Sequence, residues 1–447
     1  MTGHSGDARR AVHIGMAAFA LLLRVLTPWQ AAAFATAALL LNLFVLPRFA
    51  RQLFRPGEVG GTRVGGIVFY PLAVLVLIVV FPRRPDIVAA AWGTLAFGDG
   101  VAGLVGARVG GRRWPWNPDK TLAGTAGFVL AGSLGAALLS AWTRPAVTAQ
   151  PSWTFTLLAP IAAVLVAAMV ESMRAGLDDN LSVPFTAAAT MWLCTLVDGG
   201  AWHAALPLVL GRLPWAVLVN LVVAFASYRA GSVSTSGLVA GIAVGIIIYA
   251  CGGPAGWVLL FAGFLLATVS SRVGLRRKNV LGIAESREGR RGAGNTIANC
   301  VVGTIAAAAA VVSTHAPLAL LAMTAALIAG ASDTVASELG KAWGGRTFLP
   351  TTLRRVRPGT PGAMSFEGTA AGVLAAALLA VMAVGLRLMP MHWAWVVVVA
   401  ATAGAVIESL LAATLEASGV LDNDLLNFLN TAAAAAAAVL IAWRIPA

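Results

Sequence analysis

Residues 316–341 read APLALLAMTAALIAGASDTVASELGK, and this stretch decides what we expect of the whole fold. Its first part is an apolar run long enough to cross a hydrocarbon core about 30 Å thick as a helix. Its second part carries Asp333 at what is then a helix end, where an ionisable group is a candidate for function. The stretch therefore predicts a membrane-spanning helix that ends in chemically active side chains.

Similar apolar runs recur along the chain, which has 447 residues, is 59% hydrophobic and 11% charged, and has a formal net charge of +13. A soluble protein has about 25% charged residues, so the composition excludes an ordinary soluble enzyme and a disordered chain. The runs do not alternate with polar residues at period two, which excludes a membrane β-barrel. We expect an all-α polytopic membrane protein, in which the basic excess indicates cytoplasmic loops and no nucleic-acid partner.

The runs between charged residues and Pro or Gly breaks predict about fifteen transmembrane helices. Their ranges are 11–27, 29–47, 64–82, 86–107, 121–142, 153–175, 183–210, 213–229, 234–250, 253–272, 294–313, 316–340, 366–388, 391–415 and 425–443. Most Lys and Arg residues fall in four loops that this count places on one side of the membrane, at 48–63, 108–120, 272–291 and 341–357. By the positive-inside rule that side is the cytoplasm, and we expect the plasma membrane of a bacterium.

The sequence contains an internal repeat, because the segment around Asp333 has a counterpart around Asp99. Four landmarks recur in the same order: Gly98–Ala102 with Ser332–Ala336, Thr121–Ala126 with Ser365–Ala370, Glu171-Ser172 with Glu408-Ser409, and Leu177–Asn180 with Leu421–Asp424. An even number of spans separates equivalent landmarks, so both copies have the same orientation. We therefore expect two parallel-repeated five-helix cores, in domains 1–210 and 211–447, with two active sites or one active and one degenerate.

Each copy brings carboxylates from three segments to the cytoplasmic helix ends. They are Asp99, Glu171, Asp178 and Asp179 in the first copy, and Asp333, Glu408, Asp422 and Asp424 in the second. Carboxylates beside basic loops suit Mg²⁺ that is bound together with nucleotide phosphates. Gly124-Thr125 and Gly368-Thr369 stand at helix starts, where backbone N–H groups can reach a phosphate. His13 is interpreted as an interfacial residue.

Two parts of the sequence resemble families of membrane enzymes. The segments Gly98-Asp99-Gly100 and Trp116–Thr125 are similar to the phytol kinase and dolichol kinase family, over about residues 8–200. The segments Arg277–Asn279, Arg290-Arg291, Ala331–Lys341 and Pro358–Thr369 resemble the DUF92 family, which includes the phytyl-phosphate kinases of plants, over about residues 215–445. The resemblance implies a fusion that converts an isoprenoid alcohol of the phytol, geranylgeraniol or farnesol type to its monophosphate and then its diphosphate. It also implies CTP as phosphoryl donor and Mg²⁺ as cofactor.

The resemblance assigns roles to residues in both copies. In the first copy, Asp99 and Glu171 would be catalytic, Asp99, Asp178 and Asp179 would hold metal, and Lys120, Thr121, Gly124 and Thr125 would bind nucleotide phosphates. In the second copy, Asp333 and Glu408 would be catalytic, and Asp333, Glu338, Glu367, Asp422 and Asp424 would hold metal. Its nucleotide or phosphate ligands would be Lys278, Asn279, Arg290, Arg291, Asn295, Asn299, Lys341, Ser365, Gly368 and Thr369. Ala123 stands where dolichol kinases have Glu, which favours the phytol kinase branch.

Two other functions are alternatives. A membrane cytidylyltransferase would join CMP to a lipid phosphate and release pyrophosphate, whereas a kinase leaves CDP. A secondary transporter would also have internal repeats, but the repeats here are parallel and their charged landmarks lie at the cytoplasmic edge and not at the membrane centre. The expected partners are an isoprenoid lipid, a nucleotide and the lipid bilayer, and the sequence predicts no particular oligomeric state.

Overall fold

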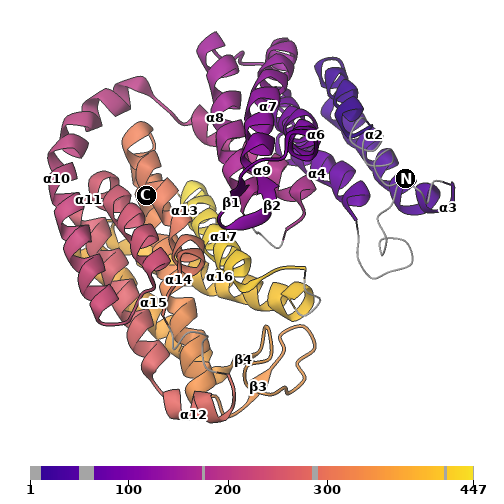
Figure 1. The fold of residues 1–447 in the computed structure, drawn as a ribbon. Helices are drawn as coiled ribbons and strands as arrows, with labels where there is room; N and C mark the ends of the chain where they lie inside the picture. Colours follow the sequence, from indigo (N-terminus) through magenta and orange to yellow (C-terminus); the bar gives the residue numbers. More distant parts are fainter. Residues whose placement is uncertain (1–11, 50–64, 174–176, 284–289, 417–419, 446–447) are drawn as a thin grey trace. The chain divides into compact units, whose positions relative to one another are not determined.

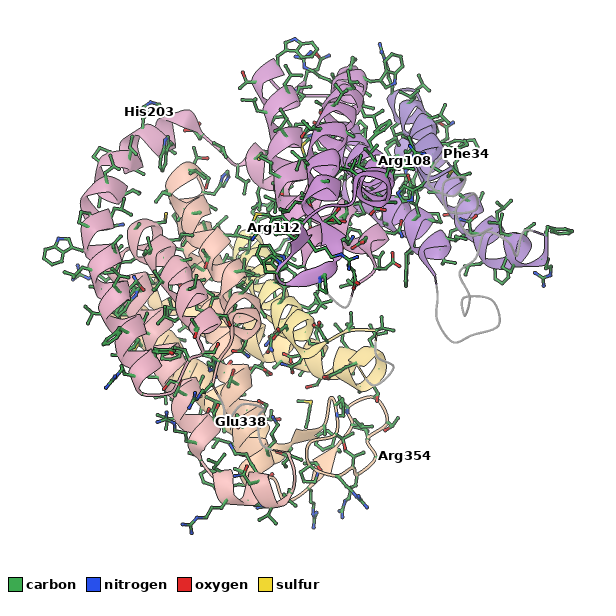
Figure 2. The ribbon with its side chains drawn as sticks, in the orientation of Figure 1. Phe34, Arg108, Arg112, His203, Glu338 and Arg354 are labelled. Carbon is green, nitrogen blue, oxygen red and sulfur yellow. The ribbon has the colours of Figure 1, made fainter. Side chains whose placement is uncertain are left out.

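The structure, a computed structural model, describes residues 12–49, 65–173, 177–283, 290–416 and 420–445, and these residues are almost entirely helical (Figure 1). Within them, eleven helices are long and apolar enough to cross a membrane, and Val12–Arg24 and Gly66–Val80 are shorter apolar helices. Large apolar side chains such as Phe34, which is 63% exposed, project outward from the helices (Figure 2). Lipid-facing helices require such a surface, so the chain is an all-α polytopic membrane protein, as predicted.

The chain divides into two compact units, Met1–Thr195 and Leu196–Ala447. The predicted helix over 183–210 is wrong, because α9 (Asp179–Thr195) ends inside this range and α10 (Gly199–Arg229) begins inside it and continues past residue 210. The Asp198 side chain explains the break, since its Oδ1 accepts a hydrogen bond from the Ala201 N–H at 2.7 Å and caps α10. The two compact units meet in sequence at Thr195 and Leu196, next to this break, and the domains 1–210 and 211–447 stay a prediction.

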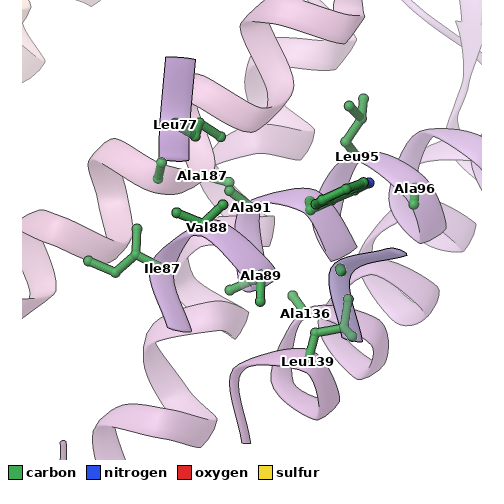
Figure 3. Close-up of a cluster of buried hydrophobic side chains, with 14 of the residues drawn as sticks. Leu77, Ile87, Val88, Ala89, Ala91, Leu95, Ala96, Ala136, Leu139 and Ala187 are labelled. Atoms are coloured by element: carbon green, nitrogen blue, oxygen red, sulfur yellow. The ribbon is translucent and has the colours of Figure 1, made fainter. Parts of the chain in front are cut away.

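The first unit is built around α5 (Pro85–Gly93), in which every residue from Asp86 to Gly93 is buried. Figure 3 shows Leu77, Ala136, Leu139 and Ala187, from three neighbouring helices, around the small side chains of α5. Ala and Gly let these helices approach closely, which is how helices pack where lipid removes the usual hydrophobic drive. The other elements are η1 (Met16–Arg24), α2 (Pro28–Leu40), η2 (Leu41–Val45), α3 (Leu46–Phe49), α4 (Gly66–Val80), η4 (Thr94–Asp99), α6 (Gly100–Val109), β1 (Arg113–Trp114), β2 (Asn117–Thr121), α7 (Leu122–Thr143), η5 (Arg144–Ala146) and α8 (Trp153–Ser172).

The second unit is built around α14 (Ala316–Trp343), which packs against α11, α13, α15, α16 and α17. Its other elements are α11 (Thr235–Arg272), α12 (Leu275–Val280), α13 (Ala293–Val312), β3 (Thr347–Phe348), β4 (Met364–Ser365), α15 (Phe366–Gly385), η7 (Met391–Trp393), α16 (Ala394–Leu411), η8 (Ala412–Glu416) and α17 (Asn423–Arg444). From α13 to α17 the order is one helix, the central helix, a β-hairpin and three further helices. The same order runs from α4 to α9 in the first unit, where α5, η4 and α6 together form the central helix.

The repeat extends to single contacts. Thr121 caps α7 by accepting from the Gly124 N–H at 3.0 Å, and Ser365 caps α15 by accepting from the Gly368 N–H at 3.1 Å. A Cβ atom at Gly106, or at its counterpart Gly340, would lie 3.1 Å from the capping hydroxyl oxygen. Gly106 and Gly340 therefore mark a close crossing of the central helix with the next helix in both units.

The long helix α11 is a hairpin of two helices, as the separate predictions for 234–250 and 253–272 imply. Gly253 has non-helical backbone angles (φ 77°, ψ 174°), and a Cβ at Gly256 would lie 3.6 Å from Ile248, eight residues earlier. Arg212 of α10 donates to the carbonyl of Ala250 at 3.4 Å and so caps the first half of the hairpin. With α11 counted as two, each predicted span has a helical counterpart, while the predicted ends at 11, 64 and 174–175 lie outside the described residues.

Candidate active sites

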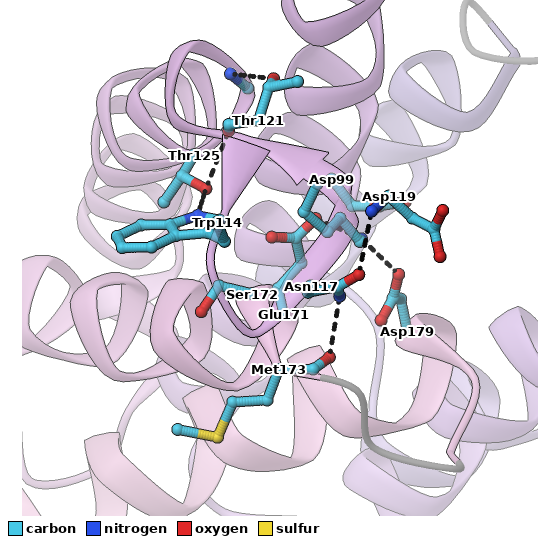
Figure 4. A network of polar contacts seen from close by, with 12 residues as sticks. Asp99, Trp114, Asn117, Asp119, Thr121, Thr125, Glu171, Ser172, Met173 and Asp179 are labelled. Atoms are coloured by element: carbon cyan, nitrogen blue, oxygen red, sulfur yellow. Dashed lines mark hydrogen bonds and ion pairs between the residues drawn. The ribbon is translucent and has the colours of Figure 1, made fainter. Parts of the chain in front are cut away.

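In the first unit, a β-hairpin reaches the carboxyl end of α8, where Asn117 lies beside Met173 (Figure 4). The same hairpin carries Lys120 to Glu171 of α8. Trp114 and Trp116 stack at 4.5 Å, and Trp116 Nε1 donates to Ser172 Oγ at 3.4 Å. Asn117 Nδ2 donates to the carbonyl of Met173 at 3.3 Å. These contacts tie the hairpin to the end of α8, so the segment Trp114–Lys120, with its unusual aromatic content, serves to position one ammonium group.

Lys120 lies among carboxylates that come from three different helices. Its Nζ donates to Asp179 Oδ2 at 2.8 Å and also to Glu171 Oε1. Glu171, at the end of α8, is only 3% exposed, and carboxylate oxygens of Asp99, Glu171 and Asp179 lie within 4.8 Å of one another. Burial lowers the pKa of Lys120, but the charges of Asp179 and Glu171 outweigh it and hold that pKa above its usual value. Lys120 is therefore a fixed cation.

The donor set of the first unit fits a hard divalent cation. Mg²⁺ prefers carboxylate oxygens and is usually bound by one or two of them together with substrate phosphates. Within the described residues, Oε2 of Glu171 is buried and has no hydrogen-bond partner, which leaves one of its oxygens available as a ligand. Asp99, Glu171 and Asp179 are thus the residues of this unit that the structure brings together for a metal.

His13 belongs to this site, although its sequence context suggested only an interfacial position. Its Nε2 lies 3.8 Å from Asp99 Oδ2 and 3.2 Å from the carbonyl of Leu95. Its ring meets Tyr70 edge-on at 4.8 Å, and the Tyr70 hydroxyl accepts a hydrogen bond from Trp92 Nε1 at 2.8 Å. No local signal could reveal this contact, because His13 and Asp99 are far apart in the sequence and meet only in the fold.

The other predicted residues of the first unit have local structural contacts. Thr121 caps α7 through the Gly124 N–H, and Thr125 Oγ1 accepts from Trp114 Nε1 at 2.9 Å. Asp178 Oδ1 accepts from the backbone N–H of Asn180 at 2.9 Å and so starts α9. The structure does not bring Asp178 into the group of Asp99, Glu171 and Asp179.

In the second unit, the repeated carboxylates line a cavity of about 340 Å³, which we call the polar cavity. Asp333 of α14 and Glu408 of α16 both line it and lie close enough to interact. Lys341 lines the same cavity from the last turn of α14. The wall also includes the predicted residues Asn295, Ser365, Gly368 and Thr369, together with Asn423 of the last landmark. Glu416 and Asn427 line it too, and sequence reasoning missed them.

Lys341 is held by Glu338, which also forms a buried ion pair with Lys278. Glu338, 1% exposed, accepts from Lys341 Nζ at 2.9 Å and from Lys278 Nζ at 2.6 Å. Lys278 is fully buried and also donates to the carbonyl of Ser271 at 2.7 Å. Neither Lys278 nor Glu338 lines the polar cavity, so the structure places these two predicted ligands behind the site, where they fix Lys341.

A Gly- and Pro-rich loop, 358–362, forms part of the wall of the polar cavity. Gly359 and Gly362 have φ values of 85° and 72°, a conformation that glycine adopts without strain. A Cβ at Gly362 would collide with the backbone of α16 at Ser409. The glycines therefore let the loop lie directly against the helix that carries Glu408.

The remaining predicted residues of the second unit lie at helix starts or on the surface. Asp422 Oδ1 caps α17 by accepting from the Leu425 N–H at 2.9 Å, and Glu367 Oε1 accepts from the Gly345 N–H at 3.1 Å. Asp424 lies against Gly294 at the start of α13. Asn279 and Arg290 are exposed, and Arg291 and Asn299 line a separate cavity that is described below.

The fold and the two sites define a polytopic membrane protein in which each unit brings carboxylates and a lysine together. Asp99 and Asp333 do not lie at helix ends, as the sequence suggested, because the central helices Pro85–Val109 and Ala316–Trp343 each continue for ten residues beyond them. Residues 218–435 match the family described as integral membrane protein DUF92, and the chain belongs to this family. An uncharacterized membrane protein of Synechocystis sp., sll0875, is 37% identical over 199 residues, which are 44% of this chain and 77% of that protein. No solved structure matches the chain.

Two plant proteins extend the comparison. Protein VTE6, chloroplastic, of Arabidopsis thaliana is 34% identical over 215 residues, 46% of this chain and 65% of that protein. Phytol kinase 1, chloroplastic, of the same plant is 31% identical over 130 residues, 29% of this chain and 43% of that protein. The chain thus spans just under two thirds of the first and less than half of the second. These matches confirm the resemblance to both DUF92 proteins and phytol kinases.

Proposed function

We propose that this protein is a bifunctional kinase that converts an isoprenoid alcohol to its monophosphate in the first unit and the monophosphate to the diphosphate in the second, with CTP as donor. The observation that carries the proposal is the repeated site: in each unit, a carboxylate from the central helix lies with a carboxylate from a later helix beside a lysine. The likeness to phytol kinases supports kinase chemistry, and the DUF92 match supports a separate reaction in the second unit.

The first unit has the groups that phosphoryl transfer to an alcohol needs. Such a transfer depends mainly on positioning and on stabilising the phosphate charge. Asp99 accepts the proton of the alcohol, Lys120 contacts the transferred phosphate, and Glu171 and Asp179 hold Lys120 in place. A Mg²⁺ ion at Asp99, Glu171 and Asp179 would supply further neutralisation of the nucleotide phosphates.

The second unit suits a nucleophile that already carries negative charge. A lipid monophosphate needs no base to activate it, but it must approach an anionic nucleotide, so cations dominate. Lys341 supplies a positive charge inside the polar cavity, and Lys278 and Glu338 hold it there. Asp333 and Glu408 are the carboxylates that would bind Mg²⁺ with the nucleotide. Both sites would face the cytoplasm of a bacterial cell, where CTP is available.

The test is product analysis with the purified full chain in detergent, supplied with Mg²⁺, CTP and phytol, farnesol or geranylgeraniol. Lipid products are identified by mass spectrometry, with ATP and UTP as alternative donors. We expect monophosphate first and diphosphate later, with one CDP released at each step. A CDP-lipid together with pyrophosphate would replace the proposal by the cytidylyltransferase alternative.

Two variants test whether the reactions belong to separate units. Asp333→Asn should stop the reaction at monophosphate, with diphosphate formation reduced at least about 100-fold, the scale on which one electrostatic group acts in catalysis. Glu171→Gln should fail on the alcohol yet still convert supplied monophosphate. If either variant loses both reactions while remaining monodisperse by size-exclusion chromatography, the two-site model is wrong.

A further inference from the structure

We infer that a second cavity in the second unit holds the first isoprene unit of the lipid monophosphate, next to its phosphate, an inference that rests on the proposed function of this unit. This cavity, which we call the apolar cavity, has a volume of about 130 Å³ and lies between α10, both halves of α11, α13 and α14. It is distinct from the polar cavity, where the nucleotide would bind.

Asn295 connects the two cavities. Its side chain, in the first turn of α13, lines both the polar cavity and the apolar cavity. A lipid monophosphate has the matching division, since its phosphate must reach the nucleotide while its hydrocarbon chain must avoid water. A junction of one residue between a charged and an apolar compartment therefore suits this class of substrate.

The far part of the apolar cavity is lined with aromatic rings. Trp257 and Phe261 stack at 5.2 Å, and Phe261 and Phe264 follow at 6.3 Å, all on the second half of α11. Trp257 Nε1 donates to Asn220 Oδ1 at 3.0 Å, which satisfies the only donor of the indole and leaves its ring face apolar. Such rings suit the methyl branches and double bonds of an isoprenoid chain.

The part of the apolar cavity next to Asn295 carries two polar side chains, Arg291 and Asn299, and backbone hydrogen bonds hold Arg291 in place. Arg291 accepts from the Ser234 N–H at 3.0 Å and donates its own N–H to Ser232 at 3.1 Å, which holds the residue at the cavity wall. Among the described residues, Oδ1 of Asn299 is buried without a hydrogen-bond partner. A monoprotonated phosphate can contact the Arg291 guanidinium and donate its O–H to Asn299.

With the lipid phosphate beside Asn295 and the nucleotide in the polar cavity, the transfer can be described bond by bond. The lipid phosphate oxygen beside Asn295 forms a bond to the γ-phosphorus of CTP, the bond from that phosphorus to the β,γ-bridging oxygen breaks, and CDP leaves. The first isoprene unit stays in the apolar cavity throughout. The cavity thus selects the substrate by its chain, and the polar cavity performs the transfer.

Gly241 gives a sharp test, because it lines the apolar cavity and a Cβ there would meet nothing within 4 Å. Gly241→Phe should fill the cavity without disturbing the backbone and raise the KM for geranylgeranyl monophosphate at least about tenfold. The KM for CTP and the phosphorylation of the alcohol should stay within twofold. Gly211→Phe is the matched control, since Gly211 of α10 is exposed, has open space around it and does not line the cavity.

A binding measurement separates this inference from the proposed function. Geranylgeranyl monophosphate with a diazirine on its chain, added without nucleotide, should cross-link to the peptide 237–264 of the wild type and of Gly211→Phe, but not of Gly241→Phe. This pattern would support the cavity even if no diphosphate were ever formed. Cross-linking outside α10, α11, α13 and α14, or equal cross-linking of all three proteins, would overturn it.

Discussion

The lysine in each unit comes from a different place, although the carboxylates around it repeat. Lys120 lies on β2 and reaches Glu171 and Asp179 across the hairpin, whereas Lys341 lies in the last turn of α14 and is held by Glu338. The repeat therefore keeps carboxylates at equivalent positions in both units, whereas the lysine comes from a non-equivalent position in each. Under the function proposed above, this difference fits two reactions on one lipid, because an alcohol nucleophile needs a base and a phosphate nucleophile needs cations.

The buried pair of Lys278 and Glu338 leads to a prediction about stability. Lys278→Met leaves Glu338 with one of its two cations, and removing one partner of a buried pair costs about 3–5 kcal/mol. We expect a clear fall in the melting temperature of the protein in detergent, together with slower diphosphate formation because Lys341 loses its support. Adding Glu338→Gln should restore part of the stability but not the activity.

Arg276→Met is the control for this prediction, because Arg276 lies on the same short helix and is exposed. It should leave the melting temperature nearly unchanged. If Lys278→Met were equally harmless, the ion pair would contribute no stability, and Lys278 would return to the role of phosphate ligand that its sequence context suggested.

At the scale of elements, the close crossing of α14 and α15 determines the shape of the polar cavity. A Cβ at Gly368 would lie 2.5 Å from the carbonyl oxygen of Ala336 and 3.0 Å from the Cα of Gly340. Gly368 also lines the cavity, so any separation of the two helices moves its wall. The distance between α14 and α15 therefore determines the shape of the polar cavity.

Gly368→Ala should therefore destabilise the second unit by about 1–3 kcal/mol, the usual cost of overpacking. It should also slow diphosphate formation while alcohol phosphorylation continues. Gly385→Ala, on the same helix but with open space around it, should cause no loss in either measurement. Melting curves and product ratios of the two variants check this, and equal behaviour of both would contradict the close crossing.

The sequence predicted these elements because their signals are local. Apolar runs, capping residues and the landmarks around Asp99 and Asp333 each lie within a few turns of helix, so the repeat can be read directly. The contact of His13 with Asp99 and the burial of Lys278 depend on packing between distant segments, which one sequence does not reveal. The helix over 183–210 failed although Asp198, Gly199 and Gly200 mark the break, because apolar residues continue on both sides of it.

At the scale of the whole molecule, the hairpin in α11 decides whether the two repeats have the same orientation. Two spans at 235–272 give an even number of crossings between Asp99 and Asp333, whereas a single crossing would invert the second unit. The contact between Gly256 and Ile248 supports two spans. The count of spans places Arg84 on the side of the membrane opposite the four basic loops, which is an exception to the positive-inside rule. Arg84 forms an ion pair with the buried Asp86 at 2.7 Å, so its charge is neutralised and the exception is weaker.

Single cysteines test this topology in a chain whose Cys194, Cys251 and Cys300 are replaced by Ala. Arg112→Cys and Arg354→Cys, both exposed beside the β-hairpins (Figure 2), should react with a membrane-impermeant maleimide in inverted vesicles and not in intact cells. Gln150→Cys and Met391→Cys, exposed at the opposite helix ends, should react in intact cells. If Arg112→Cys and Arg354→Cys were labelled from opposite sides, the repeats would be inverted. Two kinase sites on one face of the membrane would then be excluded, and the transporter alternative would regain its strongest structural argument.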